Sequence, residues 1–441
     1  MQKIEVKNFR QISYACIDLR DLIFIIGEQA CGKSTVVKLI YFCKSLKQDF
    51  VDILSHGDVH NAKEAQDRLI KTIQDKFAVY FGYTSSLASD FSVKFSFSDE
   101  EDDYIHLFKA KSLQVKFSDN MWQNIYLQSQ AYLSRVKKHN IQSYPSFQLQ
   151  EKANGTLNAY LIDIAAEVFH DRRSALFFPA GRNITVSYPE QFQLLFFGSM
   201  NVPMNAKTAE RNTVDMKLMK EFFSYSKFLV DYFSDQRHNI NPSSPFLSAV
   251  ADRINLILHG KYKNSSGNER IIYDKDGHVP LNIASSGQQE SIRIIQDLVY
   301  LLNEKESACR IIEEPETHLF PAAQAALIQL MAMIANYTGS QFIVTTHSPF
   351  VMAAFNNLLY YRKVVTSNES VKASVDEHFH VVDVKYYGVS PESFQAYALS
   401  TSSDSYCKSI FDSETQMIGE NYIDEASEVL YGDFDYLYSR I

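Results

Sequence analysis

The chain has no hydrophobic run that would cross a bilayer, since none approaches the roughly 18 to 20 uninterrupted apolar residues that a spanning helix needs. Its first residues alternate between polar and apolar types and lack the charged, apolar and small-residue regions of a signal peptide. The five cysteines are scattered and form no CxxC pair, which disfavours a disulfide framework and a cysteine metal site. These absences predict a soluble, cytoplasmic protein without membrane contact.

Basic residues are in the minority, because 43 Lys and Arg stand against 52 Asp and Glu and give a net charge of −9. This balance disfavours a protein that coats nucleic acid through bulk electrostatics, although a local basic patch would still permit DNA binding. The hydrophobic fraction of 46% is that of an ordinary globular protein, and 441 residues suffice for two or three domains.

Glycine is sparse, yet Gly27 and Gly32 lie between an expected strand at residues 22–26 and a helix that starts near Ser34. The segment fits the pattern GxxxxGK(S/T), in which backbone N–H groups wrap closely around phosphate oxygens. We expect Lys33 to reach the outer phosphates and Ser34 to ligate Mg²⁺. A glycine-rich turn before an ordinary helix is the alternative interpretation. The expected nucleotide-binding residues of this loop are Gly27, Glu28, Gln29, Ala30, Cys31, Gly32, Lys33, Ser34 and Thr35.

Two carboxylates, Glu313 and Glu314, follow the apolar residues Ile311 and Ile312 at the end of an expected strand. Ligands of open parallel sheets bind at the carboxyl ends of the strands. Because successive strand residues point in opposite directions, we assign Glu313 to the metal and Glu314 to the attacking water, which it would orient and deprotonate. A solvated acidic turn is the alternative.

A histidine and a serine-rich turn complete the set of candidate residues. His347 follows the expected strand at residues 341–344, from which its side chain would donate a hydrogen bond to a terminal phosphate; a surface histidine without a function is the alternative. Residues 285–288 precede a helix with an apolar stripe, and on their own they predict an N-cap with a flexible turn.

In their order along the chain, these segments resemble an ABC-type ATPase of the RecF, SMC and OLD-nuclease group. The resemblance is strong over residues 1–45 and 280–360, and it distinguishes the chain from the ATPase subunits of transporters. The motifs that carry it are Walker A at 27–34, the signature at 285–288, Walker B at 310–314, the switch histidine His347, and the segments VKNFR at 6–10, FPAGR at 178–182 and EEPETHLFP at 313–321.

The resemblance implies an α/β fold: a P-loop ATPase head with a mixed sheet flanked by helices, an antiparallel β lobe and a mainly helical insertion. It also implies a homodimer or higher homo-oligomer that binds ATP and Mg²⁺ between two copies. Lys33, Glu314 and His347 would then be the catalytic residues, and Arg10 would lie near the adenine. Ser285, Ser286, Gly287 and Gln288 would complete the nucleotide site of the other copy. Ser286 replaces a glycine of the signature, and Glu313 stands where many relatives have aspartate.

OLD-type nucleases also carry a Toprim domain, with a lone Glu and an Asp-x-Asp pair that hold metal. The segment Asp433-Phe434-Asp435 has this spelling, but it lies at the extreme C-terminus and reads as acidic decoration of a tail, so we expect an ATPase without its own nuclease. Stand-alone ATPases that resemble this chain occur in bacterial anti-phage systems, which implies a sensor or scaffold that controls a separate effector, a nuclease or toxin. A DNA-repair or chromosome ATPase that clamps DNA is the second hypothesis.

The sequence predicts two hairpins and a further strand, and a division of the chain into four segments. Alternating apolar residues at 91–97 and a second strand at 104–109 predict an antiparallel hairpin, residues 271–281 predict another, and residues 379–387 read as a strand. The segments are an N-terminal lobe with Walker A at 1–120, a mainly helical insertion at 121–270, a lobe with the signature, Walker B and switch histidine at 271–360, and a C-terminal completion with an acidic tail at 361–441.

Overall fold

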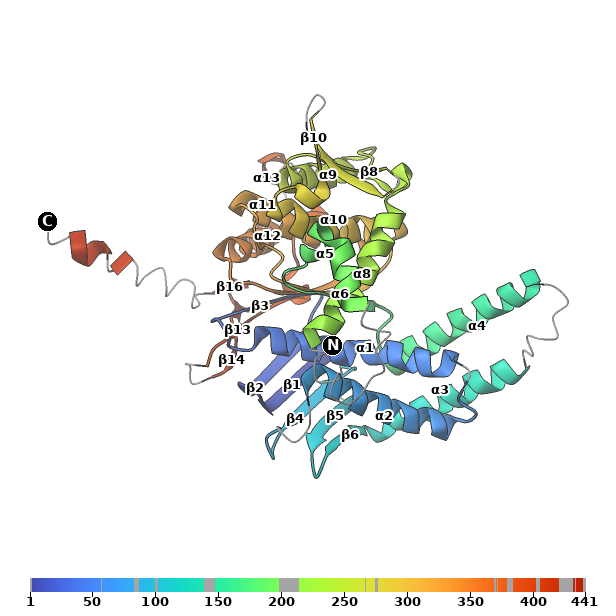
Figure 1. Cartoon of the computed structure of the whole chain (residues 1–441). Helices are drawn as coiled ribbons and strands as arrows, with labels where there is room; N and C mark the ends of the chain where they lie inside the picture. The colour runs from blue at the N-terminus through green and yellow to red at the C-terminus, as the bar shows by residue number, and fades with distance from the viewer. Residues whose placement is uncertain are drawn as a thin grey trace. The chain divides into compact units, whose positions relative to one another are not determined.

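The computed structural model groups the chain into two compact units (Figure 1). Unit 1 comprises Met1–Leu19, Lys38–Ala175 and Asn212–Val214, and unit 2 comprises Arg20–Val37, Leu176–Arg211 and Asp215–Ile441. Each unit is therefore assembled from pieces that lie far apart in the sequence. The residues that the structure describes are 2–56, 58–82, 87–99, 102–138, 147–197, 214–265, 267–273, 277–368, 370, 372–378, 384–401, 405–419, 431–432 and 434–438.

Unit 1 contains an antiparallel five-stranded sheet with the strand order β2-β1-β4-β5-β6. Its strands alternate buried and more exposed residues, as in β1, where Ile4 and Val6 are fully buried. The predicted hairpin at 91–97 and 104–109 is confirmed, since Val93 pairs with Leu107 in antiparallel register. The strands are β1 (Gln2–Phe9), β2 (Ile12–Leu19), β4 (Ser92–Ser96), β5 (Tyr104–Lys109) and β6 (Leu113–Phe117).

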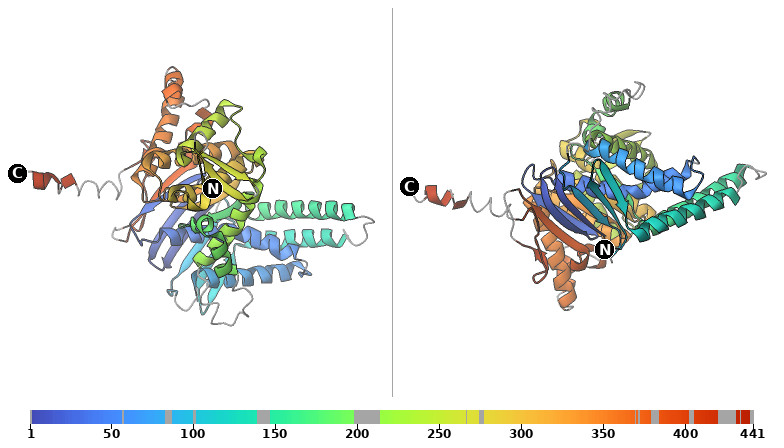
Figure 2. Two further views of the ribbon diagram at one scale, coloured as in Figure 1. Left: turned by 45° about the horizontal axis from the view of Figure 1, so that its top comes forward. Right: turned by 90° about the horizontal axis from the view of Figure 1, so that it is seen from below.

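The helices of unit 1 pack through aromatic side chains. Phe9 of β1 meets Phe77 and Phe81 of α2, whose own ring centroids lie 4.9 Å apart. Two long helices, α3 and α4, lie side by side (Figure 2). The helices are α2 (Ala62–Phe81), α3 (Asp119–Lys138), α4 (Phe147–Val168) and all but the first residues of α1 (Lys33–Ser55).

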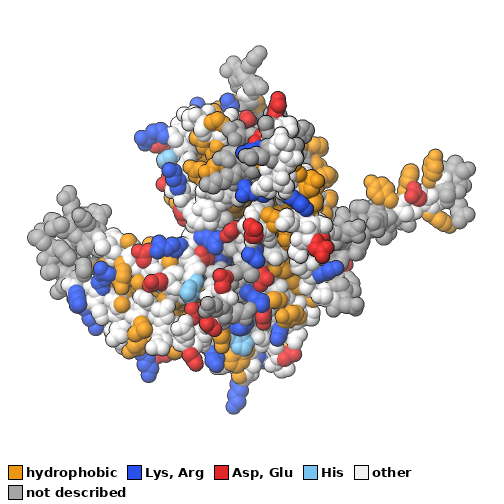
Figure 3. Space-filling view, turned by 180° about the vertical axis from the view of Figure 1, so that it is seen from behind, with side chains coloured by type: hydrophobic (Ala, Val, Ile, Leu, Met, Phe, Trp, Pro, Cys, Tyr) orange, Lys and Arg blue, Asp and Glu red, His pale blue; other side chains and the backbone are white. Residues whose placement is uncertain are grey.

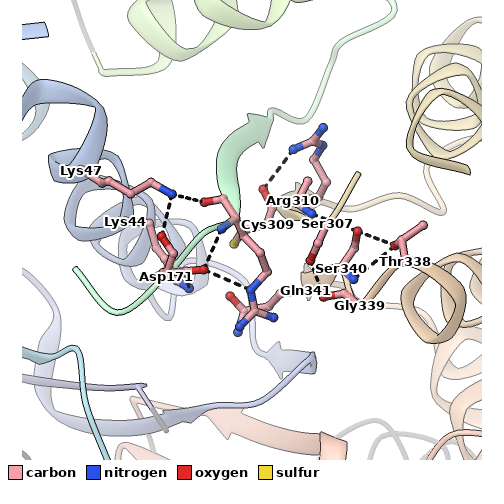
Figure 4. A network of polar contacts seen from close by, with 12 residues as sticks. Lys44, Lys47, Asp171, Ser307, Cys309, Arg310, Thr338, Gly339, Ser340 and Gln341 are labelled. Carbon is pink, nitrogen blue, oxygen red and sulfur yellow. Dashed lines mark hydrogen bonds and ion pairs between the residues drawn. The ribbon is translucent and has the colours of Figure 1, made fainter. Parts of the chain in front are cut away.

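A buried ion pair fixes α1 within unit 1 (Figure 4). Lys44 Nζ lies 2.7 Å from Asp171 Oδ2, and Lys47 donates to the backbone carbonyls of Asp171 and Arg173. Burial alone would raise the pKa of Asp171, but Lys44 and Arg173 outweigh it and lower that pKa to about 2. The carboxylate therefore stays charged over the whole physiological range.

Unit 2 is built on a six-stranded mixed sheet with the order β14-β13-β3-β12-β11-β7. Strands β13, β3, β12 and β11 run parallel, and β14 pairs antiparallel with β13. The parallel strands β3, β12 and β11 are almost entirely buried, as expected when helices cover both faces of a sheet. The strands are β3 (Leu22–Gly27), β7 (Ser174–Phe178), β11 (Ala308–Glu313), β12 (Gln341–Thr345), β13 (Phe394–Leu399) and β14 (Cys407–Ser409).

A single hydrophobic core joins this sheet to the helices of unit 2. Phe24 of β3, Leu298 of α10, Leu327 of α11 and Phe355 of α12 all belong to it and are at most 1% exposed. The main helices are α8 (Val214–Tyr232), α9 (Pro245–Leu258), α10 (Ser286–Glu304), α11 (Pro321–Thr338) and α12 (Pro349–Ser367); shorter ones are α5 (Ile184–Ser187), α6 (Pro189–Phe197), α13 (Lys372–His378) and α14 (Val384–Tyr387).

The fold class expected from the sequence is confirmed: a mixed α/β sheet flanked by helices, together with an antiparallel sheet. The hairpin at 271–281 is confirmed too, with β9 (Asn268–Ile272) pairing with β10 (His278–Pro280); β8 (Lys261–Ser265) adds a third strand. The strand predicted at 379–387 is wrong for residues 384–387, which form α14 and face α11 and α12. Asp433 lies outside the described residues.

Candidate nucleotide site

Three parallel strands of unit 2 end at the same edge of the sheet. Strand β12 lies between β3 and β11, with Thr345 opposite both Ile25 and Glu313. The loop with the phosphate-binding pattern leaves β3, the two carboxylates end β11, and His347 follows β12. The edge where the carboxyl ends of parallel strands meet is the usual ligand site of such sheets, so the three motifs share one location.

The glycine loop leads from β3 directly into α1, and Lys33 begins this helix. Ala30 and Gly32 both have positive φ values, 62° and 98°, a left-handed backbone conformation that also occurs in anion-binding nests. A Cβ on Gly27 would lie 2.3 Å from the Leu399 carbonyl oxygen, so only glycine fits there. The loop therefore has the backbone geometry that phosphate binding needs.

Lys33 lies within this loop. Its Nζ donates to the carbonyl oxygens of Gly27 and Glu28, at 2.8 and 2.7 Å. Burial lowers the pKa of Lys33, while Cys31 and the carboxylates of Glu314 and Glu28 oppose that shift. The ammonium group of Lys33 is thus held by backbone oxygens close to the N-terminus of α1. Its charge adds to the positive potential of the helix end, which favours phosphate.

The segment that connects β13 and β14 supports the loop, a contact that no sequence pattern predicts. The Tyr406 hydroxyl donates to the Cys31 carbonyl oxygen, and the Ser400 hydroxyl lies 3.4 Å from Glu28 Oε2. Burial raises the pKa of Tyr406 well above its usual range, so its hydroxyl remains a donor. Cys31 itself is buried, which suits a packing role for its side chain.

The two carboxylates of β11 have different surroundings. Glu313 is 5% exposed, and its Oε2 accepts a hydrogen bond from the Ala180 backbone at 3.3 Å. The Glu314 side chain is 41% exposed, and its backbone has a positive φ of 44°. This turn directs Glu314 away from the sheet interior, so one carboxylate is fixed and the other faces the open edge.

His347 lies beside Glu314. Its Nε2 is 3.7 Å from Glu314 Oε1, and its backbone N–H donates to Glu316 Oε1 at 3.1 Å. Burial and the nearby Lys33 charge lower the pKa of His347, while Glu314 opposes that shift. The imidazole is therefore neutral near pH 7, with one nitrogen able to donate and the other able to accept.

Glu316 is a site residue that the sequence interpretation missed. It is 8% exposed, and its carboxylate accepts from the Thr346 hydroxyl as well as from the His347 backbone. Glu316 thereby ties the loop after β12 to the loop after β11. The only sequence signal was a third acidic residue in the segment that follows Walker B.

The serine-rich turn at 285–288 caps helix α10. Ser285 is its N-cap, and Gln288 completes a capping box with it. Gln288 is buried, and its amide also donates to the Leu258 carbonyl oxygen at 2.6 Å. A Cβ on Gly287 would lie 2.7 Å from the His318 carbonyl oxygen, so glycine lets α10 pack closely on the loop after β11. Ser285 and Ser286 alone among these four residues are exposed.

Arg10 makes its described contacts within unit 1. Its Nη2 donates to the Phe81 carbonyl oxygen at 3.3 Å, and its guanidinium lies over the rings of Phe9 and Phe81. The remaining sequence candidates, from Gly27 to Ser34 with Glu313, Glu314 and His347, all lie in unit 2.

The oxygen donors at this edge fit a magnesium ion that is bound together with a phosphate. Ser34 is exposed at the start of α1, and Glu313 supplies a buried carboxylate. Mg²⁺ is usually held by one or two such protein oxygens, with phosphate and water oxygens completing its shell. Over the described residues, no three His, Cys, Asp or Glu side chains come together as a metal site of protein ligands alone.

Residues 1–352 match the family described as AAA ATPase domain, so the chain belongs to this family of P-loop ATPases. None of the curated proteins matches it. Solved structures that are similar include an SMC head bound to the C-winged helix domain of ScpA, with 13% identity and a TM-score of 0.38 over 80% of this chain and 90% of that one. The SMC head domain from Thermotoga maritima is 14% identical, with a TM-score of 0.35 over 80% of this chain and 90% of that one. An Smc head domain with an extended coiled coil bound to the C-terminal domain of ScpA, derived from Pyrococcus furiosus, is 15% identical, with a TM-score of 0.34 over 80% of this chain and 92% of that one.

A search of the described helices for membrane spans found none that combines the necessary length with sufficient hydrophobicity.

Proposed function

We propose that the protein binds and hydrolyses ATP with Mg²⁺ at the edge formed by β3, β12 and β11. The observation that carries this proposal is the position of Glu314 and His347, 3.7 Å apart, at the strand edge from which the glycine loop also leaves. A nucleotide's phosphates would bind the N–H groups of this loop and Lys33. Ser34 and Glu313 would hold the metal ion, whose charge stabilises the phosphoryl oxygens.

Glu314 is the proposed general base, because its carboxylate faces the open edge while Glu313 is fixed by the Ala180 backbone. Orienting water and accepting its proton requires such a partly exposed carboxylate within reach of the terminal phosphate. His347 would donate a hydrogen bond to that phosphate, since its imidazole is neutral and held by Glu316 through the adjoining backbone.

We further propose that ATP is bound between two copies of the chain. Ser285 and Ser286 are exposed at the N-terminus of α10, a position that favours anions through the helix dipole. Three large apolar side chains are exposed in the segments that carry the motifs: Ile283 before the signature, Phe320 after Walker B and Phe350 after the switch histidine, at 69%, 74% and 49%. Such side chains are typical of a surface that a partner covers. Gly287 and Gln288 are buried, so they would support the exposed serines rather than form the surface themselves.

Phosphate release by the purified chain tests the catalytic proposal. With ATP and Mg²⁺, the wild type should release phosphate, whereas Glu314→Gln should release it far more slowly while ATP still binds. Equal rates for the two proteins would contradict the assignment of Glu314, and a wild type that does not bind ATP would contradict the function itself.

The OLD-like resemblance supports a role as a sensor or scaffold for a separate effector in anti-phage defence. Co-purification of the tagged chain from its native host should recover a nuclease or toxin as a stoichiometric partner, and deleting that partner should abolish protection against phage. A chain that protects cells when expressed alone would contradict this role.

Clamping of DNA is the second candidate, supported by the resemblance to the RecF and SMC group. On the face shown in Figure 3, basic and acidic side chains of the described residues are interspersed rather than separated. Binding to the DNA backbone depends on clustered positive charge, so the described residues of this one face do not add support for the clamp. Stimulation of ATP turnover by duplex DNA at low salt, lost as salt rises, would instead favour the clamp.

A further inference from the structure

Arg182 is a fully buried arginine in unit 2 that contacts two of the motif segments at once. Its Nε donates to the Glu290 carbonyl oxygen at 3.0 Å and lies 3.4 Å from the Glu290 carboxylate. Its Nη1 and Nη2 donate to the carbonyl oxygens of Glu313 and Glu314, at 2.9 and 3.1 Å. One side chain therefore joins the first turns of α10 to the end of β11.

The arginine fork suits this position. Nη1 also donates to the Pro179 carbonyl oxygen at 3.2 Å, so all three guanidinium nitrogens have partners on three separate segments. A guanidinium presents five donors in one rigid plane, whereas an ammonium group is a single point with flexible reach. The arrangement fixes the backbone at Glu313 and Glu314, where the positive φ of Glu314 would otherwise be unfavourable.

A second ion pair joins the same two elements further along. Asp297 of α10 pairs with Arg310 of β11 at 2.9 Å, and both side chains are almost fully buried. Glu290 and Asp297 are seven residues apart, which places them on one face of the helix. Helix α10 and strand β11 are thus joined by charged contacts at two levels.

We propose that Arg182 is a positioning residue that couples the signature end of α10 to the two carboxylates of the hydrolysis site. This inference rests on the proposed function, because in a dimer the α10 N-terminus of one copy would meet the nucleotide of the other. Arg182 connects that end of α10 with the Glu314 of its own copy. A change at one nucleotide site of the dimer would reach Glu314 of the second site through this side chain, which contacts the carboxylate segment directly.

The test compares Arg182→Lys with Arg293→Lys as a matched control. Arg293 lies on α10 and is also buried, but its described partners are Glu269 of β9 and Gln296 of its own helix rather than β11. Three properties are measured for each full-length variant: the melting temperature, the affinity for a fluorescent ATP analogue, and the rate of phosphate release as a function of ATP concentration. Both variants should lower the melting temperature, because each loses buried hydrogen bonds of a guanidinium group.

The two variants should then differ in hydrolysis. For Arg182→Lys we expect ATP affinity within about threefold of the wild type and turnover lower by about 10- to 100-fold, since the general base is displaced while the phosphate loop is intact. Any cooperativity of the wild-type rate with ATP concentration should be lost. For Arg293→Lys, turnover of the folded protein should stay within about threefold of the wild type.

Turnover of Arg182→Lys close to that of the wild type would overturn the inference, as would equal losses for both arginine variants. If Arg182→Lys does not fold, Glu290→Gln serves as the test variant. It removes the ion pair between Arg182 and the Glu290 carboxylate and keeps the hydrogen bond to the Glu290 carbonyl oxygen. Reduced turnover with unchanged ATP affinity is expected for it, and unchanged turnover would overturn the inference. A wild type that neither binds nor hydrolyses ATP would instead refute the proposed function.

Discussion

The Nε2 atom of His347 lies 3.7 Å from Oε1 of Glu314, although the two residues follow different strands and are separated by a whole helix. Glu316 maintains this proximity, because its buried carboxylate accepts from the Thr346 hydroxyl and the His347 backbone. A carboxylate and an imidazole are therefore held together at one edge of the sheet. Groups held in this way can act on one phosphate without the entropic cost of bringing them together.

Lys33→Ala should abolish ATP binding. The change removes a charge-assisted phosphate contact and the two hydrogen bonds that Lys33 makes to the loop carbonyls. We expect the affinity for a fluorescent ATP analogue to fall by about 100-fold or more, measured by titration. Lys47→Ala is a suitable control, because the described hydrogen bonds of Lys47 go to the backbone carbonyls of Asp171 and Arg173 in unit 1. An unchanged affinity for Lys33→Ala would contradict the phosphate site.

Ser285→Arg should leave ATP binding by the monomer intact and prevent ATP-dependent association. The residue is exposed at the start of α10, where a long side chain would block a partner surface. Ser285→Asn is the control for the cap, since asparagine also caps helices well and should keep the melting temperature near that of the wild type. Association of Ser285→Arg at wild-type strength, measured by light scattering, would exclude this surface from the dimer.

Gly287→Ala should destabilise the protein by about 1–3 kcal/mol, because overpacking forces the backbone of a tight contact to shift. The added methyl would lie 2.7 Å from the His318 carbonyl oxygen. Gly155→Ala in α4 is the control: its Cβ would meet nothing within 4 Å, and alanine favours a helix over glycine. Thermal unfolding should therefore shift in opposite directions, and equal shifts would contradict the close contact of α10.

Asp171→Asn should destabilise unit 1 by about 2 kcal/mol at pH 7, as a pKa lowered from 3.8 to about 2 implies. A carboxylate with a lowered folded-state pKa stabilises the fold above its unfolded pKa, and this contribution is lost as pH falls through the folded value. The difference in melting temperature between wild type and variant should thus shrink between about pH 4 and pH 2. A difference that is constant with pH would show that the Lys44 pair contributes nothing.

The sequence was most informative where neighbouring residues act together. The strand, glycine loop and helix at 22–55 are consecutive, so their pattern predicted both the structure and the phosphate chemistry. The carboxylates were predicted from their position at the end of β11. Glu313 and Glu314 have different surroundings because strand residues alternate between two faces and because the backbone turns at Glu314. The alternation can be read from a sequence, whereas the turn cannot.

The sequence pattern did not predict the contacts between segments that lie far apart along the chain. Arg182 and Tyr406 contact motifs that lie more than 100 residues away along the chain, at Glu313 and Cys31. Glu316 lies next to Walker B in the sequence, but its partners Thr346 and His347 follow another strand.

The nucleotide contact that the signature implies for Gln288 stays a prediction. In the structure its side chain is buried and donates to the Leu258 carbonyl oxygen, a contact that the sequence did not predict. The strand expected at 379–387 is wrong for residues 384–387, because so short a run of mostly apolar residues does not distinguish a strand from a helical turn.

The most direct test is the mass of Glu314→Gln in solution, measured by light scattering with and without ATP and Mg²⁺. The variant should bind ATP, hydrolyse it very slowly and accumulate as a species of two copies, which returns to one copy when the nucleotide is removed. A variant that stays a single copy at saturating ATP, with the nucleotide demonstrably bound, would contradict the composite site.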